Sequence, residues 1–144
     1  MSMITENVAQ IRSRIAAAAR AAGRDPADIR LCAATKMNDS AAVREAIAAG
    51  VDCCGENRVQ ELVKKLDEHA YDGAPVHFIG ALQRNKVRQV VGQVDVIESV
   101  DRRELLADIN AEAAKRGIVL DILLEINAGG EKQKSGFLLK EFPR

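Results

Sequence analysis

The fold is decided by the stretch Ile29-Arg30-Leu31-Cys32-Ala33-Ala34-Thr35-Lys36, a mostly apolar run of strand length that ends in two polar residues. It follows a turn at Asp25-Pro26, and a short apolar run bounded by turn residues is typical of a β-strand. Asp39-Ser40 then offers an N-terminal cap for a helix that runs to about Ala49 and ends at Gly50. The stretch therefore predicts one strand followed by one helix.

The same strand-and-helix unit recurs along the rest of the chain. Four further apolar runs have the length of strands, and glycines interrupt the chain near most of them. We expect these strands at residues 51–54, 76–79, 94–98 and 119–126. Gly55 and Gly80 are expected to break the second and third strands, and Gly117 to end the helix before the fifth.

Helices are expected between these strands. One begins at Asn57, a second covers residues 82–91, and Asp101 with Glu104 forms a D-x-x-E cap on a third. Before the first strand, apolar residues recur at a helical period from Val8 to Ala22, which predicts an extra N-terminal amphipathic helix.

Five strands that alternate with helices, at spacings of roughly 20 to 25 residues, are typical of parallel β/α units. The fold class is therefore α/β, and the length of 144 residues suits a single domain over residues 1–144. A doubly wound sheet and an eight-fold TIM-type barrel both fit this pattern. The sequence lacks G-x-G-x-x-G after the first strand, which weakens the dinucleotide-binding version of the doubly wound sheet.

Composition narrows the classes of partner. The 21 basic and 21 acidic residues cancel, so the overall charge does not favour nucleic acid or an anionic membrane. We see no signal peptide and no run of roughly 18 apolar residues, and we expect a cytoplasmic protein that does not span a membrane. Cys32, Cys53 and Cys54 are expected to be buried, reduced thiols, because their spacing matches neither a metal knuckle nor a redox pair.

Polar residues stand where the strands end, which is the edge where β/α proteins bind ligands. Lys36 is the strongest candidate. A lysine directly after an apolar strand is expected to be partly desolvated. Desolvation would favour its free amine, which is the form that attacks a carbonyl. On position alone, an ordinary solvated loop lysine is the alternative.

Three other candidates are less specific. His77 lies within a strand and is either a hydrogen-bonded core histidine or a contact to the ring or phosphate of a ligand. Asn57 either caps the helix that begins there or orients a ligand. Gly129-Gly130 is either an anion cradle or a plain turn.

A basic cluster formed by Arg84, Lys86 and Arg88 raises a nucleic-acid alternative. The cluster has no interleaved aromatic residues, which argues against binding of single strands by stacking. A solvated helix face is the other explanation. No serine, histidine and aspartate pattern stands out, no metal site is expected, and nucleic acid is not the expected partner.

The motifs themselves resemble a known family. The resemblance lies in five blocks, which occur in this order: Ala33-Ala34-Thr35-Lys36, Gly55-Glu56-Asn57-Arg58-Val59-Gln60-Glu61, His77-Phe78-Ile79-Gly80-Ala81-Leu82-Gln83-Arg84-Asn85-Lys86, Ser99-Val100-Asp101, and Lys134-Ser135-Gly136-Phe137. The first three look like the A-x-[ST]-K, GEN-x-VQE and HFIG-x-LQ-x-NK blocks of the pyridoxal 5′-phosphate (PLP) homeostasis proteins, and the last two match two further blocks of that family. The blocks span nearly the whole chain.

The resemblance implies the fold-type III barrel of the alanine racemase N-terminal domain. It also implies that PLP is held as a Schiff base on Lys36, with Asn57 and His77 at the cofactor, and that the protein buffers PLP without catalytic turnover of its own. The resemblance also implies a monomer when the barrel is intact. A fold-type III racemase or decarboxylase, and a non-cofactor interaction or RNA-binding module, remain the alternatives.

Length is the main departure from the family. The chain holds about five of the eight β/α units of a TIM-type barrel, so we expect an incomplete barrel. The resemblance places the phosphate-binding loops in the part that is missing here, which implies weakened PLP affinity. Open sheet edges also predict oligomers or aggregation.

Overall fold

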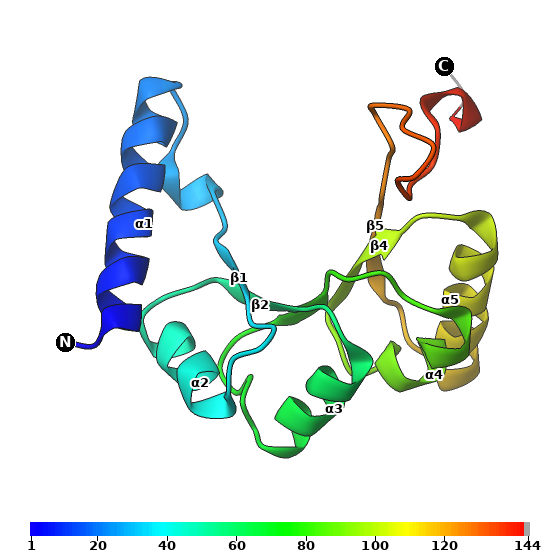
Figure 1. Cartoon of the computed structure of the whole chain (residues 1–144), viewed down its shortest axis with the longest axis horizontal. Coiled ribbons are helices and arrows are strands. Elements are labelled where there is room, and N and C mark those ends of the chain that lie inside the picture. Colours follow the sequence, from blue (N-terminus) through cyan, green and yellow to red (C-terminus); the bar gives the residue numbers. More distant parts are fainter. Residues whose placement is uncertain (143–144) are drawn as a thin grey trace. The chain divides into compact units, whose positions relative to one another are not determined.

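The computed structural model describes residues 1–142, which form α-helices, short 3-10 helices and parallel β-strands (Figure 1). The elements of regular structure are α1 (Met3–Ala21), η1 (Pro26–Asp28), β1 (Cys32–Ala34), α2 (Ser40–Ala48), β2 (Cys53–Glu56), α3 (Val59–Asp67), β3 (Val76–Phe78), η2 (Arg84–Lys86), α4 (Val87–Val90), β4 (Val96–Val100), α5 (Arg103–Arg116), β5 (Asp121–Leu124) and η3 (Leu139–Glu141). The predicted α/β class and the N-terminal helix are confirmed.

The strands belong to one sheet with the order β1-β2-β3-β4-β5. The pairs β1–β2, β3–β4 and β4–β5 are parallel, and their registers align Ala34 with Gly55 and Phe78 with Ile97. In a doubly wound sheet the order of the strands reverses at a switch point. In a β/α barrel the strands lie side by side in chain order. The described strands follow chain order, so the barrel-type arrangement is the correct one of the two.

Two compact units make up the chain. The first comprises Met1–Gly55 and Gln60–Val76, and the second comprises Glu56–Val59 and the residues from His77 onward. Whether the whole chain acts as a single domain stays a prediction. Within residues 1–142, no helix has both the length and the apolar character needed to cross a membrane.

In the first unit, α2 begins at the cap that the sequence predicts. The Asp39 side chain accepts a hydrogen bond from the Ala42 N–H at 2.8 Å and begins α2. Gly23, with φ of 68°, follows α1 in the left-handed conformation that glycine adopts without strain. Val43 and Leu62 are buried side chains of α2 and α3.

Two predictions in the first unit are wrong. Gly55 does not break the second strand, because it pairs with Ala34 and β2 continues to Glu56. Cys53 and Cys54 are buried as predicted, but Cys32 is exposed. Successive side chains of a strand point to opposite faces, and Cys32 lies with Ala34 on the exposed face of β1.

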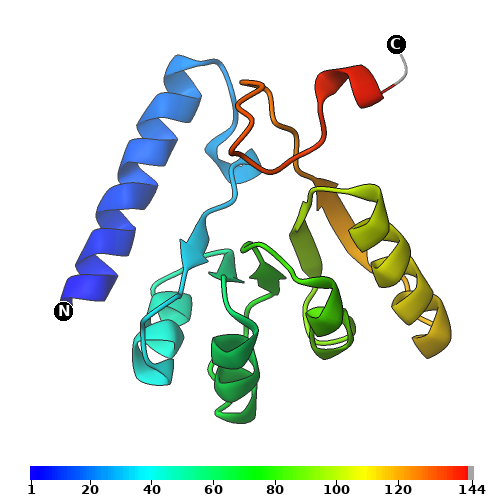
Figure 2. The same ribbon diagram turned by 45° about the vertical axis from the view of Figure 1, so that its right-hand side comes forward.

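The second unit packs α5 along its sheet, and Figure 2 shows α5 (yellow) beside β5 (orange). Phe78, Ile97 and Leu105 are fully or almost fully buried there. Gly117 ends α5 with φ of 66°, as predicted. The helix predicted over residues 82–91 is shorter than expected, because residues 84–86 form a 3-10 turn before α4.

The predicted cap at Asp101 is wrong. The N-cap residue of α5 is Arg102, and its side chain makes no capping hydrogen bond. The Asp101 carboxylate instead accepts a hydrogen bond from Nη1 of Arg102. An ion pair with a neighbouring side chain has thus replaced the cap that the D-x-x-E spacing suggested.

Candidate functional site

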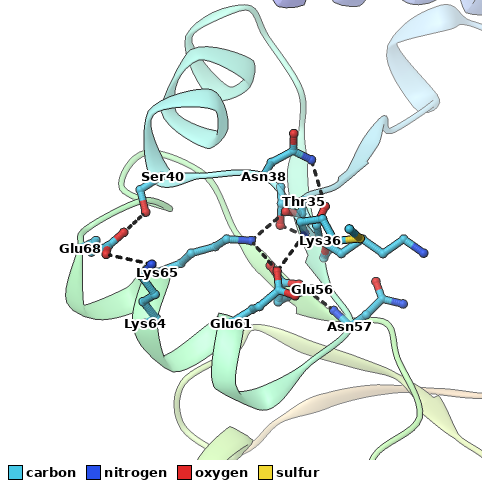
Figure 3. A network of polar contacts seen from close by, with 12 residues as sticks. Thr35, Lys36, Asn38, Ser40, Glu56, Asn57, Glu61, Lys64, Lys65 and Glu68 are labelled. Atoms are coloured by element: carbon cyan, nitrogen blue, oxygen red, sulfur yellow. Dashed lines mark hydrogen bonds and ion pairs between the residues drawn. The ribbon is translucent and has the colours of Figure 1, made fainter.

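Lys36 lies on a turn that follows β1 in the first unit. Its side chain is exposed, and in Figure 3 it points away from Lys65. The desolvation expected from its place in the sequence is therefore wrong, because the turn carries the residue beyond the strand end and into solvent. An exposed amine is accessible to a dissolved carbonyl compound.

The turn itself is well anchored. Thr35 donates to the Gly55 carbonyl oxygen through its N–H at 2.9 Å and through Oγ1 at 3.2 Å. Asn38 closes the turn with hydrogen bonds to the Thr35 and Lys36 carbonyl oxygens, at 3.2 Å and 3.0 Å. Met37 has φ of 60°, a left-handed conformation that is uncommon for a residue other than glycine.

Two charged side chains of α3 reach this turn (Figure 3). Lys65 is only 4% exposed, and its Nζ donates to the Thr35 carbonyl oxygen at 2.7 Å. Oε2 of Glu61 lies 3.2 Å from Nζ of Lys65 and accepts the Met37 N–H at 2.9 Å. Both the turn and the ion pair belong to the first unit.

Sequence reasoning missed the role of this pair. Its signal was nevertheless present, because Glu61 and Lys65 are four residues apart and so lie next to each other on a helix. Lys65 also follows Leu62 by three residues, which places it on the buried face of α3.

Asn57 belongs to the second unit, directly after β2. Its N–H donates to Oε1 of Glu56 at 3.0 Å, but its own Oδ1 is buried and makes no hydrogen bond within the described residues. A capping side chain would accept a backbone N–H, so the capping explanation is wrong. An unsatisfied buried amide oxygen costs about 1–3 kcal/mol, and a ligand donor would relieve that cost.

The backbone of Asn57 also packs closely against Gly80. A β-carbon built on Gly80 would lie 2.3 Å from the Asn57 carbonyl oxygen, which no real side chain tolerates. The N–H of Ile79 donates to the Glu56 carbonyl oxygen at 2.9 Å. The GEN and HFIG blocks are therefore in direct backbone contact in the second unit.

His77 lies on β3 and pairs with Glu98 of β4. Its Nδ1 is 2.6 Å from Oε1 of Glu98, and the two side chains are 15% and 30% exposed. His77 aligns with Val96, and Glu98 is two residues further along β4 on the same face. The hydrogen-bonded histidine expected as one explanation is thus present, and sequence reasoning had missed its partner Glu98.

Arg84 and the Gly129-Gly130 turn have structural partners. Arg84 makes two hydrogen bonds to the Asp108 carboxylate, which lower the pKa of Asp108 below its ordinary value. This pairing reduces the charge that Arg84 could offer to nucleic acid. Gly130 donates its N–H to the Asn127 carbonyl oxygen at 3.3 Å, and Oε1 of Glu131 would lie 3.7 Å from a β-carbon at Gly129. A nearby carboxylate favours the plain turn over an anion cradle.

The Lys134-to-Phe137 block closes the loop after β5. The Phe137 N–H donates to the Glu125 carbonyl oxygen at 2.8 Å, and the Asn127 N–H donates to the Phe137 carbonyl oxygen at 2.9 Å. Oγ of Ser135 donates to Oε1 of Glu125 at 2.9 Å. This block therefore shapes the loop. Among residues 1–142, no three histidine, cysteine or acidic side chains cluster as metal ligands.

Comparisons with known proteins agree with this arrangement. Residues 6–144 match the family model described as alanine racemase, N-terminal domain. The chain is 41% identical over 143 residues to the pyridoxal phosphate homeostasis protein of Pseudomonas aeruginosa, and 40% identical over 144 residues to that of Escherichia coli. These alignments cover 99% and 98% of this chain.

Solved structures are similar as well. A crystal structure of an unknown protein from Bifidobacterium adolescentis has a TM-score of 0.86 and 42% identity, over 92% of this chain and 58% of that one. The structure of PipY from Synechococcus elongatus with PLP bound has a TM-score of 0.77 and 32% identity, over 94% of this chain and 58% of that one.

The chain spans 62% of the length of the two curated relatives named above. The motif blocks, the chain-order parallel sheet and a family match over residues 6–144 all agree with one another. The chain belongs to the family of the alanine racemase N-terminal domain.

Proposed function

We propose that this chain binds PLP and that Lys36 is the residue to which PLP attaches. The observation that carries the proposal is the exposed amine of Lys36 on an anchored turn at the carboxyl end of β1. Relatives of 40% and 41% identity are named pyridoxal phosphate homeostasis proteins, and the PipY structure has PLP bound. These names support the ligand, and the position of the amine supports the attachment point.

The residues present fit this ligand. PLP supplies an aldehyde carbon, which a primary amine can attack. The exposed Nζ of Lys36 offers such an amine, and the turn holds its backbone in place. We expect binding to be reversible, which suits a protein that holds a reactive aldehyde and releases it. The proposal therefore assigns PLP homeostasis to the protein, without catalytic turnover.

Asn57 and His77 are part of the same proposal, each supported by its own surroundings in the second unit. The buried Oδ1 of Asn57 has an unused hydrogen-bonding capacity that a polar ligand group can take up. Nδ1 of His77 is engaged by Glu98, which fixes the orientation of the imidazole ring. The expected cytoplasmic location also belongs to the proposal, because reduced cysteines persist there.

The experiment compares Lys36→Ala with Lys64→Ala, a control at a lysine whose side chain is 76% exposed on α3. Each protein is incubated with PLP, reduced with borohydride and digested, and the modified lysines are identified by mass spectrometry. We expect one PLP group on Lys36 in the wild type and in Lys64→Ala, and none at residue 36 of Lys36→Ala. Equal labelling of all exposed lysines would contradict the proposal.

A further inference from the structure

We propose that Glu61 and Lys65 of α3 are positioning residues for Lys36. The inference rests on the proposed PLP attachment and deepens it, because it names the groups that set the direction of the reactive amine. Neither side chain is proposed to touch PLP. Both act through the backbone on either side of Lys36.

The two peptide groups that flank Lys36 are each bonded to one member of this ion pair. The peptide group before Lys36 presents the Thr35 carbonyl oxygen to Nζ of Lys65 at 2.7 Å. The peptide group after it presents the Met37 N–H to Oε2 of Glu61 at 2.9 Å. Because peptide groups are planar, fixing both of them fixes the two backbone dihedral angles of Lys36. The direction of its side chain at Cα is fixed with them.

The burial of Lys65 indicates that the ion pair has a specific task. The side chains of Lys65 and Glu61 are 5% and 25% exposed. A buried charge is costly even when it is paired, and an apolar residue of similar volume is often as stable in its place. A lysine at this position differs from an apolar residue in that it donates a hydrogen bond to the Thr35 carbonyl oxygen.

Met37, the next residue, has a left-handed conformation with φ of 60°. Strained backbone persists where the surroundings determine it, and it is frequent at functional sites. The hydrogen bond from the Met37 N–H to Glu61 fixes the peptide group between Lys36 and Met37. The strain lies at the residue directly after Lys36.

Helix α3 also supplies a matched control. Lys64 and Glu68 form a second ion pair with the same spacing of four residues, but their side chains are 76% and 44% exposed and their charges lie 3.8 Å apart. An exposed pair of this kind contributes little to stability. Lys64→Met therefore removes a lysine from the same helix without disturbing the turn.

The experiment measures how fast PLP attaches to Lys36 in the 144-residue chain, by borohydride trapping at successive times. The variants are Lys65→Met, Glu61→Ala and Glu61→Gln, with Lys64→Met as the control. We expect attachment about tenfold or more slower in Lys65→Met and Glu61→Ala, because a displaced reacting group loses about this much or more. Glu61→Gln keeps an acceptor for the Met37 N–H and should be the least affected of the three.

Amide hydrogen exchange of Met37 gives a second readout that does not require PLP. The Met37 N–H should exchange faster in Glu61→Ala than in Lys64→Met, and attachment should slow in step with exchange across the variants. Faster exchange with an unchanged attachment rate would overturn the positioning role. If Lys65→Met does not fold, the same comparison between Glu61→Ala and Lys64→Met decides between a positioning role and none.

Failure of the proposed function has a different outcome. If the wild type attaches no PLP at Lys36, both the function and the positioning role are overturned. If the wild type attaches PLP at Lys36 and the Glu61 and Lys65 variants do so at the control rate, the function stands and only the positioning role is rejected.

Discussion

Gly80 packs directly against the backbone of Asn57, and a β-carbon at residue 80 would lie 2.3 Å from the Asn57 carbonyl oxygen and 2.7 Å from its α-carbon. The neighbouring atoms are backbone, which cannot turn aside as a flexible side chain does. This contact explains why glycine stands after the third strand, and it links the position of Asn57 to the end of β3.

Gly80→Ala is expected to lower the free energy of unfolding by about 1–3 kcal/mol, the usual cost of overpacking. Urea denaturation followed by circular dichroism measures this change. Gly129→Ala is the control, because a β-carbon at residue 129 meets nothing closer than 3.7 Å and its φ is not in the left-handed region. Equal stability of the two variants would contradict the predicted clash.

Gly136→Ala is expected to destabilise the loop after β5. Gly136 has φ of 113°, and a β-carbon there would lie 2.6 Å from the Asn127 nitrogen. The substitution combines strain with a backbone clash, so we expect a loss of about 2 kcal/mol or more. Hydrogen exchange of the Asn127 and Phe137 amides should become faster. Unchanged protection of both amides would refute the prediction.

The His77–Glu98 pair should contribute to the stability of the second unit. Glu98→Ala removes the partner of a half-buried imidazole and is expected to cost about 1–2 kcal/mol. Glu98→Gln keeps a hydrogen-bonding group and should cost less. Thermal unfolding of the three proteins at neutral pH tests this order, and a Glu98→Gln variant less stable than Glu98→Ala would reverse it.

Asp52 should make the stability depend on acid pH. Partial burial raises its pKa, but the Leu31 N–H and the Arg12 guanidinium that bind Oδ2 outweigh this effect, so the pKa lies below its ordinary value of 3.8. A lowered pKa in the folded state stabilises the protein above pH 3.8, and this stabilisation is lost as the pH falls through the folded-state value.

Asp52→Asn should therefore be less stable than the wild type near neutral pH, by about 1 kcal/mol once solvent screening is allowed for. The difference should shrink as the pH falls below 3.8. Urea denaturation at several pH values measures it. A difference that is constant over the whole acid range would show that Asp52 does not titrate as expected.

Much of the fold could be predicted, because local patterns decide it. Short apolar runs marked β1 and β3, Asp39 marked the start of α2, and Gly117 marked the end of α5. One prediction failed because of a distant partner. Gly55 stays in its strand because Ala34 pairs with it, although a glycine viewed locally suggests an end.

By itself, the sequence determined the parallel β/α class and picked out Lys36, from its place after an apolar run and from the surrounding motif blocks. Only the tertiary structure decided how the Lys36 turn is held. The contact from Lys65 to the Thr35 carbonyl oxygen joins residues 30 positions apart. The tertiary structure also placed the Lys36 side chain in solvent, where its position after a strand had predicted burial. Local composition sets which segments form strands and helices, but a lysine and a carbonyl oxygen far apart in the chain meet only when packing brings their helix and turn together.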